Sequence, residues 1–236
     1  MAELMLVDAD SGESVRVNVS HQPLAGRDTP IDPQLAMAAA PDSASAAGYR
    51  VLRHRLARAG DPRVVVVTSA VAREGKSTCA ANLALAFAEE PDARVLLVEA
   101  NLRAPSLAQL FGVTPPECFA TQMMQHRTTP RAPWSLVEVS PSLHLAVTLG
   151  APAGAPLHLD SAALDGALTA LKEGEYHHIL VDAPPVLGSA DVNLLDRRAD
   201  ALLFTVLIGH TQGRDLALAI EQLQSPHVAG LAVLGA

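Results

Sequence analysis

The sequence contains few cysteines, few aromatic residues and very little lysine. Two of its 236 residues are cysteine and 3% are aromatic, and Lys76 and Lys172 supply all of its lysine. Cys79 and Cys118 lie far apart, without the spacing of a disulfide framework or a zinc site. We therefore expect a reducing, cytoplasmic location, with Cys79 as a small buried apolar side chain.

Long apolar runs are also lacking, although 49% of the residues are hydrophobic. No run approaches the roughly 18 to 20 apolar residues that cross a membrane. Residues 1–13 are acidic and lack the basic and apolar regions of a signal peptide. We therefore expect no membrane segment in the chain itself. The net charge of −8 disfavours broad binding to nucleic acids or anionic membranes, which attract clustered positive charge.

The most informative stretch is residues 61–82. Four consecutive valines, residues 64–67, predict a strand that is buried on both faces, as in a parallel sheet. Gly75-Lys76-Ser77-Thr78 follows, and then a segment of strong helix formers with apolar residues at helical spacing. A strand, a loop with Gly-Lys-Ser and a helix are the context of a phosphate-binding loop. An ordinary strand–turn–helix with a surface lysine is the alternative.

The residue types of this loop suit a nucleotide. Loop amides and the helix N-terminus can donate to phosphate oxygens, and Gly75 lets the backbone approach them closely. Lys76 places a positive charge near the β- and γ-phosphates, and the Ser77 hydroxyl can coordinate Mg²⁺. One departure is Ala70, which replaces the first glycine of the motif. The predicted nucleotide-binding residues are Ala72, Arg73, Glu74, Gly75, Lys76, Ser77 and Thr78.

Two further apolar strands end in polar residues. Residues 95–98 precede Glu99 and Asn101, and residues 179–181 precede Asp182. Open α/β sheets bind ligands at the carboxyl ends of their parallel strands. We therefore predict that Asp182 holds Mg²⁺, directly or through water. Capping of the turn that follows the strand is the alternative role for this carboxylate.

Strands and helices alternate along the rest of the chain, which predicts a mostly parallel, doubly wound sheet in a three-layer α/β fold of the P-loop NTPase type. Residues 113–141 are expected to be irregular, with Trp134 as a hydrophobic plug under a surface loop and a base-stacking role as the alternative. The other predicted strands are 143–147, 201–208 and 228–234, and the other predicted helices are about 43–60, up to Leu110, 161–173, 190–197 and 214–224.

We divide the chain into an N-terminal extension, residues 1–41, and a nucleotide-binding domain, residues 42–236. Residues 1–34 of the extension mix short apolar alternation with a Pro-rich segment, so that a small hairpin and a disordered arm both fit. The helix that opens the domain has a basic side formed by Arg50, Arg53 and neighbouring residues. Two interpretations of this basic side remain open, a solvated face and a docking surface.

With these motifs placed, the chain resembles the bacterial tyrosine kinases of capsule and exopolysaccharide synthesis, which belong to the partition and cell-division class of P-loop ATPases. The resemblance covers about residues 42–236. It rests on VTSAVAREGKSTCAANLALAFAE, on VLLVEANLRAPSLAQLFG and on ILVDAPPV, where the family has its first nucleotide motif, a D-x-D-x-R motif and a D-x-x-P motif. YRVLRHRL is similar to the family's E-x-x-R-x-x-R helix, whose arginines serve oligomer contacts, and Arg50 and Arg53 match them.

The resemblance implies a cytoplasmic, ATP- or ADP-binding protein that needs Mg²⁺. It also implies work with a membrane-embedded polysaccharide chain-length regulator, at the inner face of the membrane. Catalytic roles are implied for Lys76, Glu99, Asn101, Arg103 and Asp182, and metal ligation for Ser77, Asp182 and Glu99.

The departures from the family pattern matter for catalysis. Glu99 keeps the charge of the first aspartate one methylene further out, whereas Asn101 loses the charge of the second. A neutral amide weakens a carboxylate's role in orienting the nucleophile or Mg²⁺. Arg73 stands where the family often has glycine, and Ala47 stands in place of the glutamate of the arginine helix.

Three functions remain open. The first is a nucleotide-binding, catalytically weakened relative that regulates polysaccharide synthesis or export. The second is an active Mg²⁺–ATP-dependent tyrosine kinase or ATPase that phosphorylates partner proteins, with Glu99 in the role of the aspartate. The third is a small-molecule P-loop enzyme or a positioning ATPase, although Val71 replaces the lysine that positioning ATPases usually have.

Overall fold

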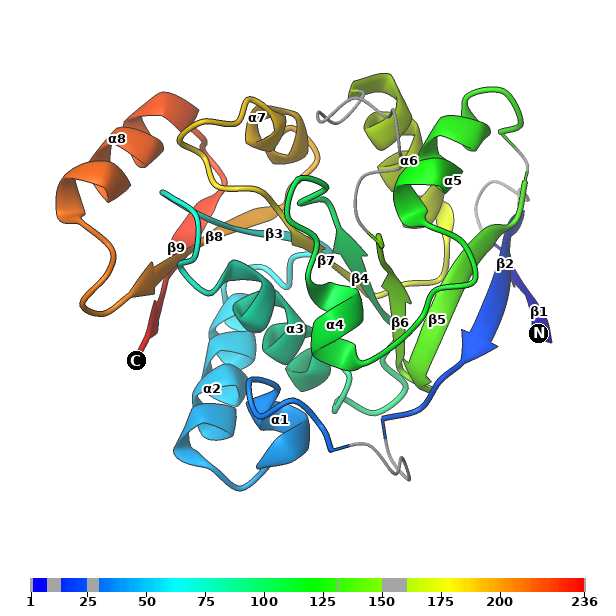
Figure 1. Cartoon of the computed structure of the whole chain (residues 1–236), viewed down its shortest axis with the longest axis horizontal. Helices are drawn as coiled ribbons and strands as arrows, with labels where there is room; N and C mark the ends of the chain where they lie inside the picture. The colour runs from blue at the N-terminus through cyan, green and yellow to red at the C-terminus, as the bar shows by residue number, and fades with distance from the viewer. Residues whose placement is uncertain (1, 8–13, 25–29, 131, 150–160, 236) are drawn as a thin grey trace.

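The computed structural model describes residues 2–7, 14–24, 30–130, 132–149 and 161–235. Over these residues the strands form one nine-stranded sheet in the order β1-β2-β5-β6-β4-β7-β3-β8-β9. Figure 1 shows helices α1 to α4 on one face of the sheet and helices α5 to α8 on the other. The predicted three-layer α/β fold is therefore confirmed.

The observed elements agree with the predicted ones apart from one or two terminal residues, except within residues 1–41 and 113–141. The strands are β1 (Ala2–Val7), β2 (Ser14–His21), β3 (Val64–Ser69), β4 (Val95–Glu99), β5 (Trp134–Ser140), β6 (Leu143–Ala146), β7 (His178–Asp182), β8 (Ala201–Leu207) and β9 (Val228–Leu234). The helices are α1 (Ala36–Ala39), α2 (Ala44–Arg58), α3 (Lys76–Phe87), α4 (Leu107–Phe111), α5 (Phe119–His126), α6 (Ser161–Glu173), α7 (Asp191–Asp196) and α8 (Gly213–Leu223).

The valine run forms the centre of the sheet. Strand β3 pairs in parallel with β7 on one side and with β8 on the other. Val64 and Val66 pack into the core on one face, and Val65 and Val67 into the core on the other. A strand that is covered on both faces has no polar side to alternate with, which explains the uninterrupted apolar run.

The N-terminal residues that the structure describes extend the sheet. Strands β1 and β2 form an antiparallel hairpin, and β2 pairs in parallel with β5. Of the two alternatives for the N-terminal extension, a hairpin and a disordered arm, the structure therefore contains the hairpin. Residues 8–13 and 25–29 of the predicted extension lie outside the described residues.

The prediction that residues 113–141 are irregular is wrong. Helix α5 and strand β5 occupy much of this stretch, and β5 pairs with both β2 and β6. Trp134, which we expected under a surface loop, is the first residue of β5 and only 1% exposed. Its ring stacks on His126 with the centroids 3.7 Å apart. The prolines of the stretch lie between the elements, where proline is tolerated, and not inside them.

Two arginines on the basic side of α2, Arg50 and Arg53, make contacts within the chain. Arg50 forms two hydrogen bonds to the Glu89 carboxylate, at 2.7 and 2.6 Å. Arg53 donates to the Ala86 carbonyl at 2.8 Å and lies 3.0 Å from a Glu90 carboxylate oxygen. Positive charge near the last carbonyls of a helix is favourable, so these arginines stabilise the end of α3. The interface role of Arg50 and Arg53 stays a prediction.

No helix in the described parts of the chain has the length and apolar character that crossing a membrane requires.

Candidate nucleotide-binding site

The site lies where three neighbouring parallel strands end. Val67 of β3 and Glu99 of β4 are each paired in register with Asp182 of β7. The phosphate-binding loop continues from β3, so the sheet itself brings the loop, Glu99 and Asp182 to one edge. This is the edge at which open α/β sheets bind ligands.

The loop between β3 and α3 uses left-handed backbone conformations at two residues. Gly75 has a φ of 75°, and a Cβ atom on it would lie 2.5 Å from Leu234 Cδ1. Both the conformation and the close approach favour glycine there. Arg73 has a φ of 65°, so that the position where the family often has glycine does adopt the left-handed region. A residue other than glycine carries a backbone cost in this conformation.

Lys76 begins α3 and its side chain is buried. Burial lowers the pKa of the Lys76 ammonium group, and the carboxylates of Asp182 and Glu74 oppose this effect. Glu74 is itself fully buried, and its Oε2 accepts the Val71 amide proton at 3.0 Å. The Lys76 ammonium group lies near two carboxylates at the end of a phosphate-binding loop, where it can bind a polyphosphate.

Ser77 and Asp182 are in direct contact. The Ser77 hydroxyl donates to Asp182 Oδ2 at 2.6 Å, whereas the buried Oδ1 has no hydrogen-bond partner among the described residues. Burial raises the pKa of Asp182 to about 7, and the charge of Glu99 adds to the increase. The Ser77 hydrogen bond and the Lys76 charge act in the opposite direction.

These two side chains fit a magnesium ion. Mg²⁺ prefers oxygen ligands and retains several water molecules, so one hydroxyl, one carboxylate and phosphate oxygens suffice. A buried carboxylate oxygen without a partner is costly unless a cation or a water molecule satisfies it. The predicted roles of Ser77 and Asp182 as metal ligands are therefore supported by contact and chemistry, and they stay predictions.

Glu99 uses both of its oxygens on backbone amides. Oε1 accepts from the amides of Ser106 and Leu107, at 2.5 and 2.8 Å, and Oε2 accepts from the Thr148 amide at 2.8 Å. Burial raises the pKa of Glu99, and these three bonds oppose the increase. The carboxylate thus joins the N-terminus of α4 to the segment after β6. The catalytic and metal-binding roles of Glu99 stay predictions, and its three donors count against them.

Asn101 and Arg103 follow β4 and line the same cavity. Asn101 is 7% exposed, and its Nδ2 donates to the Ala104 carbonyl at 3.2 Å. Arg103 is exposed. The predicted loop residues therefore all line the cavity, except Glu74, which is buried. Asn101 and Arg103 line the cavity beside them.

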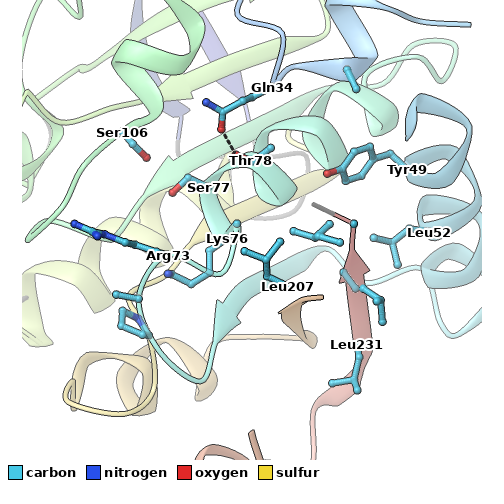
Figure 2. A pocket seen from close by; sticks show the side chains of 18 of the residues that line it. Gln34, Tyr49, Leu52, Arg73, Lys76, Ser77, Thr78, Ser106, Leu207 and Leu231 are labelled. Carbon is cyan, nitrogen blue, oxygen red and sulfur yellow. Dashed lines mark hydrogen bonds between the residues drawn. The ribbon is translucent and has the colours of Figure 1, made fainter. Parts of the chain in front are cut away.

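The cavity has a volume of about 1320 Å³. This exceeds the roughly 300 to 1,000 Å³ of most small-molecule pockets, so a nucleotide would not fill it. Figure 2 shows Lys76 and Ser77 at its polar end and the apolar side chains of Leu52, Leu207 and Leu231 further along. An apolar end beside a phosphate loop is suited to a nucleoside.

Sequence reasoning missed several of the lining residues. Gln34 comes from the predicted N-terminal extension, Tyr49 from α2, and Leu231 and Leu234 from the last strand. Tyr49 lies in the arginine helix but not at one of its motif positions, and the other residues belong to no recognisable motif. The apolar residues of β9 carry no sign in the sequence that some of them are exposed at the cavity.

Comparison with known proteins agrees with the site. The profile of the ParA family, described as NUBPL iron-transfer P-loop NTPase, matches residues 62–223. The matched region begins just before β3 and includes the phosphate loop, β4 and β7.

Individual relatives point to a narrower family. Tyrosine-protein kinase YwqD of Bacillus subtilis (strain 168) is 31% identical over 187 residues, covering 78% of this chain and 77% of YwqD. Succinoglycan biosynthesis transport protein ExoP of Rhizobium meliloti (strain 1021) is 27% identical over 183 residues. That match covers 74% of this chain and 22% of ExoP, so the chain spans under a quarter of that protein.

A solved structure described as the BceF tyrosine kinase domain superposes with a TM-score of 0.68 and 26% sequence identity. The superposition covers 85% of this chain and 81% of the BceF chain. The chain therefore belongs to the ParA-type P-loop NTPases and, among them, to the family of the bacterial tyrosine-protein kinases.

Proposed function

We propose that the chain binds ATP or ADP together with Mg²⁺ in the cavity at the carboxyl edge of the sheet. The amides of residues 72–78 bind the phosphates, and Lys76 neutralises the charge of the β- and γ-phosphates. Ser77 and Asp182 hold the metal ion. The chemistry that Mg²⁺ would supply there is stabilisation of the negative charge that develops on the phosphate oxygens.

One observation carries this proposal. The Ser77 hydroxyl lies 2.6 Å from one Asp182 oxygen, while the other oxygen is buried without a partner among the described residues. Burial of the Asp182 carboxylate without a partner for one oxygen in the described parts of the chain costs free energy, and a bound cation would reduce this cost. The motif context around Gly75 and Lys76 supplies the phosphate-binding half of the same site.

We further propose that catalysis is weakened and that the chain acts as a regulatory subunit in polysaccharide synthesis or export. Asn101 cannot accept a proton or share negative charge with Mg²⁺ as an aspartate would, and Glu99 is already engaged by three amides. The partner would be a membrane-embedded chain-length regulator, which would bring the chain to the inner face of the membrane. Arg50 and Arg53 would take part in any oligomer contact.

An active tyrosine kinase is the second candidate, because relatives such as YwqD are named as tyrosine-protein kinases. In this case the phosphate acceptor would lie on another polypeptide. Both tyrosines of the chain, Tyr49 and Tyr176, are buried, with 8% and 4% of their surfaces exposed.

ATP turnover separates the two candidates. Hydrolysis and transfer to a tyrosine peptide would be measured with Mg²⁺, alone and with a cytoplasmic fragment of a chain-length regulator, and with Lys76→Ala as the control. The weakened form predicts turnover at the level of this control under both conditions, and clear turnover would establish the active kinase instead. Asn101→Asp is expected to raise hydrolysis, and an unchanged rate would show that Asn101 is not the cause of the weakness.

A further inference from the structure

Gln34 lies beside the phosphate-binding helix although it is 44 residues away from Thr78 in the sequence. The Thr78 hydroxyl donates to Gln34 Oε1 at 3.0 Å (Figure 2). Gln34 and its neighbour Pro33 both line the nucleotide cavity. A segment outside the matched family region therefore contributes a polar side chain to the site.

Several bonds fix the position of Gln34. The buried Asn82 of α3 donates through Nδ2 to the Gln34 carbonyl at 2.7 Å and to the Thr78 carbonyl at 2.8 Å. Asn82 Oδ1 accepts the Met37 amide proton at 3.0 Å, and the Gln34 amide donates to Asp32 Oδ1 at 2.9 Å. These contacts hold the backbone of Gln34 against α3, so little conformational entropy remains to be lost on binding a ligand.

The Gln34 side chain retains a donor. Its Oε1 is used by Thr78, and Nε2 has no acceptor among the described residues. In the proposed site Lys76 would reach the β- and γ-phosphates and Ser77 the metal ion, whereas the backbone amides of the loop, up to Thr78, would cradle the α- and β-phosphates. Because Gln34 is bonded to Thr78 and lines the cavity, its amide is expected beside the α-phosphate or the adjoining ribose and not at the phosphate that a kinase transfers.

We infer that Gln34 is an additional nucleotide-binding residue, whose Nε2 donates to an α-phosphate oxygen or to a ribose hydroxyl. This inference rests on the proposed nucleotide site. It assigns a ligand-binding role to the segment before α1, and it predicts that Gln34 supports ADP and ATP equally because both share this part of the molecule.

The test compares three variants by calorimetric titration with Mg²⁺–ADP, Mg²⁺–ATP and Mg²⁺–pyrophosphate. Gln34→Ala removes the donor, and Gln34→Glu replaces it with a negative charge facing the phosphates. Gln109→Ala is the control, because Gln109 is an exposed glutamine of α4 that does not line the cavity. Thermal unfolding without ligand checks that all three variants fold like the parent chain.

Gln34→Ala is expected to weaken ADP and ATP by the same factor, roughly threefold to tenfold, which is the worth of one hydrogen bond. Gln34→Glu is expected to weaken them further, with a loss that lessens at high salt. An equal loss for pyrophosphate would place the contact on phosphate, and unchanged pyrophosphate binding would place it on ribose. Unchanged ADP affinity in both Gln34 variants would overturn the inference. Failure of the parent chain to bind ADP would instead overturn the proposed function.

Discussion

Asp182→Asn is predicted to make the ligand-free protein more stable at pH 8 and to weaken its stabilisation by Mg²⁺ and ADP. Asp182 is fully buried, one of its oxygens has no partner among the described residues, and burial raises its pKa to about 7 from an ordinary value of 3.8. An asparagine of nearly the same shape keeps an oxygen for the Ser77 hydroxyl and carries no charge to desolvate.

The sign follows from proton binding. Between about pH 4 and pH 7 the folded chain holds a proton on Asp182 that the unfolded chain has released. Stability therefore falls as the pH rises through this window, and it stays lower above pH 7. The two pKa values differ by about three, which corresponds to a loss on the order of 4 kcal/mol, with 1.36 kcal/mol for each pKa unit. Asp182→Asn abolishes this loss.

The assay is urea unfolding at pH 5 and pH 8, first with a chelator and then with Mg²⁺ and ADP. Histidines also titrate in this range, so the quantity of interest is the difference between the parent chain and the variant at each pH. Asp92→Asn is the matched control, because Asp92 is exposed and has a φ of 59°, which asparagine tolerates. Without ligand the advantage of Asp182→Asn should grow from pH 5 to pH 8.

Mg²⁺ and ADP should reverse the order of stability of the parent chain and Asp182→Asn at pH 8. Mg²⁺ binds the ionised carboxylate, so the parent chain should gain stability with Mg²⁺ and ADP at pH 8 while Asp182→Asn gains much less. Parallel stability curves for the parent chain and Asp182→Asn between pH 5 and pH 8 would refute the reasoning. They would mean that Asp182 is ionised in the folded chain at no cost.

Two other predictions concern the loop and the neighbouring strand. The free energy of unfolding of Arg73→Gly should exceed that of Arg73→Ala by about 1 kcal/mol, because the left-handed backbone at this position is unfavourable for every residue except glycine. Equal free energies in urea unfolding would show that the φ angle carries no such cost. Glu99→Gln should lower the free energy of unfolding by about 1 to 3 kcal/mol, since a glutamine has one acceptor oxygen for three buried amides. Urea unfolding at pH 7 measures this change, and an unaltered midpoint would show that the three bonds contribute nothing.

The core of the site was predictable from short local patterns. A strand, a glycine and a lysine before a helix define the phosphate loop within residues 64–87, without knowledge of the rest of the fold. Asp182 could be placed beside this loop because parallel strands end at one edge of a sheet. For Arg73 the sequence shows only that the family often has glycine at this position, and its left-handed φ is seen in the structure.

The parts that were missed depend on contacts between distant segments. Gln34 bonds to Thr78, and Asn82 binds the backbone of both, but nothing in the residues around Gln34 indicates this. The role of Glu99 was also hidden, because two of its donors follow it by seven and eight residues and the third, Thr148, by 49. A carboxylate after an apolar strand gives no sign of whether it faces a metal ion or backbone amides.

Helix α5 and strand β5 were missed for a different reason. Prolines and polar residues flank both elements closely, so that the stretch has the composition of a loop. Strand β5 nevertheless forms because β2 and β6 pair with its two edges and its alternate side chains enter the core. Pairing partners decide the state of a short strand more than its own composition does.

The most direct test of the central claim is a calorimetric titration of the folded chain with ADP, with and without Mg²⁺. We expect saturable binding that is stronger with Mg²⁺, and we expect Lys76→Ala to weaken it roughly tenfold to a hundredfold, as the loss of a charge-assisted contact does. A flat titration of the well-folded parent chain in the presence of Mg²⁺ would contradict the assignment of this cavity to a nucleotide.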